Sequence, residues 1–398
     1  MIAHMPEDQA RLLRRLDSLT RSFESRAEGY DRTAAFPAED FDELFAANLH
    51  APTVPREYGG LGLGPLQGNA YVLWKMTRSL AAADLSLARC WEGHANSLVL
   101  IDAMASPAQK ERWFRGVVER GEKWVAWSGE PKAPKGPGSE SAPRFGTTVR
   151  RDGNDWIVEG TKIFATSASG ANWAILLVDT TGPGGARHSD SPETVFMLAC
   201  DLSDPTVSID GSWWDPIGMR ATVSHLVRFH QTRIPDANRI GEPGAYLREG
   251  WQTAFIPHYA ASFLGAAEAA YEYALRYVTQ QDKTGDPYVQ QRVGAMAVAV
   301  ETADLWLQHV ADLWDRGPRA EAQLAGSRAR HVVEHLAVQT VDHCIRACGA
   351  RCLIRPSPVE RILRDLTFYV RHDNDDHILA TIGRARLGKP HDLSFYKP

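Results

Sequence analysis

Two short segments concentrate the side chains that could do chemistry. Segment 372–377, HDNDDH, offers five potential metal ligands in six residues, and HVVEH at 331–335 matches an inverted zinc-protease motif with two histidines one helical turn apart. Matches this short often arise by chance, and no distant third ligand stands out for the histidine pair. Adjacent carboxylates such as Asp375 and Asp376 more often cap a helix and complement its dipole. The sequence therefore predicts no metal site in either segment.

The elements that must position such residues follow from the period of the apolar side chains. In residues 7–120, and again from 245 to the end, apolar residues recur at spacings of three and four, as in helices with one buried stripe. Residues 124–235 alternate with a period of two, which predicts strands, and Arg-Asp-Gly-Asn at 151–154 predicts a hairpin turn. We therefore expect an α+β fold of three domains: a helical domain at 1–123, an antiparallel β domain at 124–240 and a helical bundle at 241–398.

Composition narrows the class of protein. The 398 residues suffice for two or three structural units, and a net charge of -5 gives no reason to expect nucleic acid or an anionic membrane as a partner. No run approaches the roughly 18 apolar residues that a membrane span needs. Five cysteines in so long a chain argue against a disulfide framework. We expect a cytoplasmic protein that acts on small molecules.

Four parts of the chain, in order, resemble the acyl-CoA dehydrogenase superfamily. They are VPREYGGLGLG at 54–64; GEP at 129–131 with GTKIFATSASGANWAIL at 160–176; DPIGMRATVS at 215–224; and PSPVERILRDL at 356–366. The last resembles the Pro-x-Glu-Arg-x-x-Arg-Asp signature of that superfamily. The resemblance covers nearly the whole chain, and it implies a flavin enzyme with a helical, a β and a second helical domain.

In that superfamily the isoalloxazine ring of the flavin lies against the β domain. By register, the resemblance assigns the contacts to Trp127, Ser128 and Gly129 and to Phe164, Ala165 and Thr166. Thr166 is the expected partner of flavin N5, because N5 carries the hydride or proton during turnover. A strand hydroxyl bonded to its neighbour is the alternative for Thr166. Trp214, next to Trp213, could stack on the flavin or on an aromatic substrate.

The segment after Arg364 and Asp365 departs from the dehydrogenases. The register of their catalytic glutamate falls on His372, Asp373 and Asn374, so no glutamate is present. The segment instead looks like the His-Asp segment of the two-component flavin monooxygenases of this fold. That likeness implies that His372 handles protons near the C4a–N5 edge of the flavin and that Asp373 holds the histidine's tautomer. Asp373 as a base on a carbon acid, as in nitroalkane oxidases, remains an alternative.

Other positions bear on the substrate and on the type of flavin. His94 lies where helices border the substrate cavity in this superfamily and is a second candidate for proton transfer; a core histidine bonded to a backbone carbonyl is the alternative. No Arg or Lys stands near Ile256, where thioester dehydrogenases carry an arginine for acyl-CoA. Gln281 and Thr284 replace residues that meet FAD, and Cys-Gly-Ala around Gly349 replaces a Gly-Gly pair. These changes favour FMN, reduced by a separate reductase, over FAD.

The resemblance and its departures together favour a flavin-dependent monooxygenase. Such an enzyme would use reduced flavin and O2 to hydroxylate a small aromatic or amine-bearing substrate. A flavin reductase is the expected partner, and a homodimer or homotetramer is expected because the superfamily's cofactor site borrows from a neighbouring subunit. Two alternatives stay open: oxidation of an acyl-CoA or nitroalkane-like substrate with Asp373 as base, and a flavin-free homologue that serves as a binding scaffold.

Overall fold

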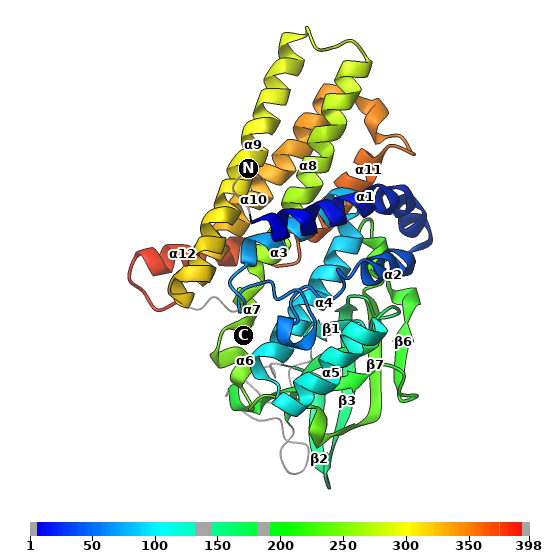
Figure 1. Ribbon diagram of the computed structural model, residues 1–398, viewed down its shortest axis with the longest axis vertical. Helices are drawn as coiled ribbons and strands as arrows, with labels where there is room; N and C mark the ends of the chain where they lie inside the picture. Colours follow the sequence, from blue (N-terminus) through cyan, green and yellow to red (C-terminus); the bar gives the residue numbers. More distant parts are fainter. Residues whose placement is uncertain (1–5, 132–144, 181–191, 374, 392–398) are drawn as a thin grey trace, which may run out of the picture.

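Helices precede and follow a β-sheet formed by the middle of the chain, and the long C-terminal helices extend away from this sheet (Figure 1). The computed structural model describes residues 6–131, 145–180, 192–373 and 375–391. The helices before the sheet are α1 (Glu7–Thr33), α2 (Ala38–Ala46), α3 (Ala70–Ala83), α4 (Leu85–Met104) and α5 (Pro107–Arg120). The α+β prediction is confirmed. We propose that the domains divide after residues 123 and 240, where helices give way to strands and strands to helices.

Local sequence explains where the helices next to the sheet begin and end. Helix α5 starts with a capping box, in which the Ser106 hydroxyl accepts from the backbone N–H of Gln109 and the Gln109 side chain accepts from the backbone N–H of Ser106. It ends at Gly121, whose φ of 67° lies in the left-handed region that glycine adopts most easily. The Asp84 side chain caps α4 by accepting from the N–H of Ser86 at 2.9 Å. Gly121 therefore allows the chain to turn from α5 into the first strand, whereas the two side-chain caps fix where α4 and α5 begin.

The middle of the chain forms an eight-stranded sheet in the order β6-β7-β3-β2-β4-β5-β8, with β1 beside β4. Its strands are β1 (Trp124–Trp127), β2 (Thr148–Asp152), β3 (Asp155–Ala165), β4 (Trp173–Thr180), β5 (Val195–Asp201), β6 (Val207–Asp210), β7 (His225–Pro235) and β8 (Arg239–Ile240). The predicted hairpin joins β2 and β3, with Asp152 opposite Asp155 and Gly153 at φ 61°. The pairs β1–β4 and β2–β4 are parallel, unlike the other pairs. Period-two alternation identifies strands but does not encode their direction.

The C-terminal part is built on three long helices that extend away from the sheet (Figure 1). Its helices are α6 (Ala245–Arg248), α7 (Trp251–Ala254), α8 (Ile256–Gln280), α9 (Pro287–Arg316), α10 (Arg319–Cys348), α11 (Pro358–Tyr369) and α12 (Asp375–Arg386). Close packing needs small residues: a Cβ at Gly265 of α8 would lie 2.3 Å from the carbonyl oxygen of Arg78 in α3. Helix α3 thus belongs to the same hydrophobic core as α8. None of the described helices is both long and apolar enough to cross a membrane.

The Arg-Asp signature joins the sheet domain to both helical parts. The Arg364 guanidinium donates to Asp31 of α1 at 2.7 Å and to the carbonyl oxygen of Ile217 at 2.8 Å. The next residue, Asp365, accepts from the backbone N–H of Met219 at 2.6 Å. A Cβ at Gly218 would lie 2.3 Å from the carbonyl oxygen of Arg364, so the loop before β7 lies directly against α11. This contact sets the position of the sheet edge relative to the end of α11.

Candidate active site

Two segments at the ends of β1 and β3, which family register assigned to the flavin, lie side by side. The indole N–H of Trp127 donates to the carbonyl oxygen of Thr166 at 3.0 Å, and the N–H of Ile163 donates to the carbonyl oxygen of Gly129 at 3.0 Å. Glycine is required at 129, since a Cβ there would lie 2.7 Å from the carbonyl oxygen of Ile163. Ser128 lies between these contacts and is partly buried.

Thr166 ends a chain of hydroxyl groups. The Ser224 hydroxyl donates to Thr166 Oγ1 at 3.1 Å, and Ser224 Oγ lies 2.8 Å from Thr222 Oγ1. Because Thr166 accepts from Ser224, its own proton is free to point elsewhere. The side chain keeps 8% exposure, so its hydroxyl can donate to a group placed against this edge of the sheet.

Backbone strain gathers at the same edge. Four non-glycine residues adopt positive φ there: Phe164 (50°), Ser167 (62°), Met219 (57°) and Val223 (42°). Such conformations cost on the order of 1–3 kcal/mol each and tend to cluster at ligand sites. Here they turn the chain sharply after β3 and before β7, where the loop leading into β7 packs against α11.

Exposed aromatic rings border this edge. Phe164 is 55% exposed and Trp213 is 37% exposed, which is unusual for such large apolar side chains, and their ring centroids lie 5.2 Å apart. Trp214 is buried, and its ring packs edge-on against Phe368 of α11 at 5.6 Å. The aromatic group therefore spans from the sheet to α11 and leaves apolar ring surface exposed at Phe164 and Trp213, close in sequence to Thr166 and Trp214.

His372 lies in the loop after α11, with its ring between two tyrosines. The centroid of the imidazole lies 5.3 Å from the Tyr259 ring and 5.8 Å from the Tyr369 ring. Within the described part of the chain, neither of its ring nitrogens has a hydrogen-bond partner, and the side chain is accessible to solvent. The surrounding protein lowers the pKa of His372 to about 3, first by desolvation and then through the positive charges of Arg89 and Arg330. Access to water offsets part of the desolvation, and the direction of the shift leaves the imidazole neutral and able to accept a proton at neutral pH.

Asp373, by contrast, has its carboxylate engaged elsewhere. The side chain is 2% exposed, and its Oδ2 accepts from Arg330 Nε at 3.1 Å and from the Tyr259 hydroxyl. Its other oxygen is ion-paired with a second nitrogen of the same guanidinium. No hydrogen bond joins Asp373 to the His372 ring among the described residues. The Asp373 carboxylate is therefore linked to the His372 imidazole only through Tyr259, whose hydroxyl bonds to the carboxylate and whose ring packs on the imidazole. Asn374 lies outside the described residues.

Arg330 is the centre of a buried ion cluster that the sequence did not reveal. Its guanidinium is inaccessible to solvent and contacts the carboxylates of Asp373, Glu334 and Asp375, the last at 2.7 Å. It also donates to the carbonyl oxygen of Val370 at 3.0 Å. The only sequence signal was the spacing of four between Arg330 and Glu334, which is common on exposed helices. The cluster attaches the loop of His372 to α10.

A second buried network, also missed, lies behind Tyr369. Glu92 of α4 is fully buried and accepts from the Tyr369 hydroxyl at 2.5 Å, from Arg89 at 3.0 Å and from Asn96 at 3.2 Å. The spacing of Arg89, Glu92 and Asn96 by three and four places them on one face of a mostly apolar helix, which was an available signal. The network fixes the tyrosine against which His372 packs.

His94 is buried, and both of its nitrogens are bonded to backbone groups. Nδ1 accepts from the N–H of Trp124, the first residue of β1, at 2.9 Å, and Nε2 donates to the carbonyl oxygen of His50 at 2.9 Å. Burial and the neighbouring His50 ring lower the pKa of His94 well below its usual value. This is the arrangement of the core-histidine alternative, in which the imidazole positions the start of β1.

The positions expected to meet the flavin tail lie away from this site within one chain. Gln281 and Thr284 are exposed at the turn between α8 and α9. Gly349 ends α10 with φ 76°, about 28 Å along the helix from Arg330 at 1.5 Å per residue. Contact between these residues and a flavin bound at Thr166 would therefore require a neighbouring subunit.

Family models match three successive stretches of the chain. They describe the acyl-CoA dehydrogenase N-terminal domain at 7–121, the middle domain at 134–232 and the C-terminal domain at 258–375. The chain belongs to the acyl-CoA dehydrogenase family. This confirms the resemblance inferred from the sequence motifs, and the family includes enzymes with different chemistry.

Relatives include both monooxygenases and dehydrogenases. Dibenzothiophene monooxygenase of Mycolicibacterium goodii is 24% identical and covers 94% of this chain and 93% of its own. The mitochondrial short-chain specific acyl-CoA dehydrogenase of Mus musculus is 27% identical over 84% of this chain and 79% of its own. Among solved structures, a complex of TdsC from Paenibacillus sp. A11-2 with FMN and indole has a TM-score of 0.84 at 24% identity, covering 97% of this chain and 100% of that chain.

Proposed function

We propose that this chain is a flavin-dependent monooxygenase that uses reduced FMN and O2 on a small aromatic or amine-bearing substrate. The observation that carries the proposal is the contrast between two adjacent side chains. Among the described residues, the accessible ring of His372 has no hydrogen-bond partner, whereas Asp373 is 2% exposed and bound to Arg330 and Tyr259. A dehydrogenase or nitroalkane oxidase needs a free carboxylate to abstract a proton, and this register offers none.

The residues at the sheet edge fit a flavin ring. A planar tricyclic ring needs an apolar surface on one face, close backbone approach and a hydroxyl donor at N5. Phe164 and Trp213 supply exposed aromatic surface, Gly129 allows close approach of the backbone, and Thr166 has a proton left to donate. The FMN complex of the similar TdsC structure supports FMN as the flavin.

The roles of the chain's own residues follow from their contacts. Bound reduced flavin supplies the electrons that activate O2. Thr166 would donate to the ring edge, its proton directed there by Ser224. His372 would accept a proton from the substrate or from the reacting oxygen, which its neutral form allows at neutral pH. Tyr259 and Tyr369 would keep the imidazole in place.

A separate flavin reductase and a second subunit complete the proposal. Reduced FMN must reach the site from a donor, and a separate flavin reductase would supply it. The exposure of Gln281, Thr284 and Gly349 agrees with a dimer or tetramer in which one subunit covers its neighbour's flavin. We propose a cytoplasmic location, where a reductase and reduced nicotinamide are available.

The test uses reduced FMN without a need to know the natural substrate. Purified protein is mixed anaerobically with reduced FMN and then with oxygenated buffer in a stopped-flow spectrophotometer, with and without indole as a probe. We expect binding of reduced FMN and a rate of flavin oxidation different from that of free FMN. If the protein neither binds reduced FMN nor changes this rate, the proposal is wrong. Bleaching of an FAD-loaded sample by butyryl-CoA would instead support the dehydrogenase alternative.

A further inference from the structure

We propose that His331, His335 and Asp375 form a binding site for one divalent transition-metal ion of the zinc type. In the sequence these residues belong to two separate segments, 331–335 and 372–377, and neither segment alone predicted a metal site. Packing of α12 on α10 brings them together: one ligand atom from each of the three lies within 4.8 Å of the others. The site lies on the outer side of α10, apart from the proposed flavin surface.

The two histidines have the spacing and ring orientation of a metal-binding pair. They lie one turn apart on α10, and their ring centroids are 4.2 Å apart. His335 Nδ1 donates to the carbonyl oxygen of His331 at 2.8 Å, which fixes the tautomer and leaves the Nε2 lone pair free. A histidine that binds a metal usually donates its other ring N–H to such an acceptor.

Asp375 supplies the third ligand, already at the right separation. His331 Nδ1 lies 3.0 Å from both carboxylate oxygens of Asp375. Cis ligands bound at about 2.0–2.2 Å from a zinc ion lie about 3.0–3.5 Å apart, so an ion can replace the proton that the two groups share. Arg330 donates to Asp375 Oδ1 at 2.7 Å and fixes the carboxylate from the buried side.

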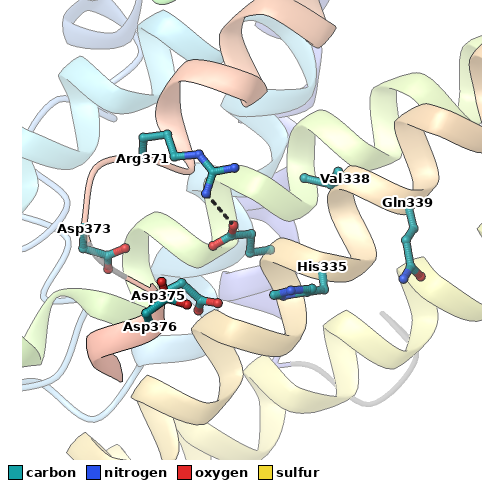
Figure 2. A pocket seen from close by; sticks show the side chains of 8 residues that line it. His335, Val338, Gln339, Arg371, Asp373, Asp375 and Asp376 are labelled. Atoms are coloured by element: carbon teal, nitrogen blue, oxygen red, sulfur yellow. Dashed lines mark ion pairs between the residues drawn. The ribbon is translucent and has the colours of Figure 1, made fainter. Parts of the chain in front are cut away.

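An open pocket leads to the site. Figure 2 shows His335 on α10 and Asp375 and Asp376 at the start of α12 facing the same space, which has a volume of about 620 Å³. Its lining residues are Glu334, His335, Val338, Gln339, Arg371, Asp373, Asp375 and Asp376. Four carboxylates of this lining outnumber the two guanidinium groups near them, Arg371 in the lining and Arg330 behind it, so the pocket favours entry of a cation. Two imidazoles select zinc, nickel, copper or cobalt over calcium and magnesium, which prefer oxygen ligands.

The bound ion would join α10 to the start of α12 across the loop that carries His372. Residues 370–374 lie between α11 and α12, and Arg330 already attaches this loop to α10 from the buried side. A metal on the outer side would attach it a second time. Binding should therefore raise the thermal midpoint of the protein, whether or not flavin is present.

The experiment measures zinc binding to the untagged full chain by isothermal titration calorimetry after treatment with a chelator. We expect one equivalent of Zn2+ to bind, and His335→Ala to weaken binding by about tenfold or more, as loss of a ligand or its support does. His335 is exposed, so this variant should fold normally. His343→Ala, on the same helix but outside the site, is the matched control and should bind as wild type does. Co2+ should give a visible absorption band in wild type that is lost in His335→Ala.

Equal zinc affinity in wild type and His335→Ala would overturn the proposal, as would an equal loss in His343→Ala. Neither measurement depends on flavin or on turnover. The metal site and the monooxygenase proposal can therefore fail separately.

Discussion

Replacing Asp373 by asparagine tests whether this residue supports the structure or performs the chemistry. In the structure its carboxylate accepts from Arg330 Nε and from the Tyr259 hydroxyl, is ion-paired with a second nitrogen of the same guanidinium, and the side chain is 2% exposed. Asparagine has nearly the same shape but one acceptor oxygen in place of two, and its amide group meets donors. The variant should therefore lose stability and keep much of its activity.

The magnitude follows from the contacts that are lost. A hydrogen bond to a charged group contributes about 1.5–3 kcal/mol, and asparagine keeps one acceptor while losing one or two such bonds. Arg330 keeps Glu334 and Asp375, so it is not left as an isolated charge, and the loss should lie at the lower end of the 3–5 kcal/mol typical of a broken buried pair. We expect about 3 kcal/mol. For a chain of this length, that corresponds to a thermal midpoint lower by roughly 4 °C.

Differential scanning fluorimetry at neutral pH measures the shift, and flavin oxidation with oxygen measures activity. Asp376→Asn is the control: it removes an equal charge from an exposed position three residues later and should change stability by less than about 0.5 kcal/mol. If Asp373→Asn keeps the wild-type midpoint and loses activity completely, the structural role is refuted. Asp373 would then be the base of the oxidase alternative.

Three further predictions concern the site and its surroundings. His372→Gln should lower the rate of substrate oxidation by about 10²–10⁴-fold without changing the thermal midpoint. Because the pKa of His372 is lowered in wild type, the acid limb of the wild-type pH–rate profile should lie below pH 6.5, and a limb above pH 7 would contradict this role. Thr166→Val should weaken FMN binding by up to about tenfold in a fluorescence titration, whereas Thr166→Ser should retain it. His258 is buried and its pKa is lowered to about 3, so its contribution to stability is complete above about pH 6.5 and is lost as the pH falls toward 3. The thermal midpoint of His258→Gln should therefore fall less steeply between pH 6.5 and 4 than that of wild type. An unchanged slope would contradict the lowered pKa of His258.

Much of the fold could be predicted because its signals are local. Apolar spacing identified the helices, alternation identified the strands, and Gly153 marked the hairpin between β2 and β3. Family register assigned both Trp127 and Thr166 to the flavin, and the structure brings the two residues together through the Trp127 indole. Strand direction was not encoded in this way, which is why the parallel pairing of β1 with β4 was not foreseen.

The environment of the histidines and of Asp373 could not be predicted, since it depends on contacts between distant residues. Arg330 precedes Asp373 by 43 positions, and no local pattern links a helical arginine to a loop carboxylate. His94 bonds to backbone groups of His50 and Trp124, which have no side-chain signature at all. A sequence shows which side chains are chemically able to transfer a proton. Whether they are free to do so depends on the hydrogen bonds that tertiary packing gives them.

The strand β1 makes the helical layer and the sheet interdependent for folding. Trp124 packs between Trp113 of α5 and Trp173 of β4, with ring centroids 5.3 Å from each, and its backbone N–H needs the His94 ring as acceptor. A fragment that began at residue 124 would leave that indole half-uncovered and the N–H unbonded. The chain should therefore unfold its first two domains in one cooperative transition, even though family models divide it into separate modules.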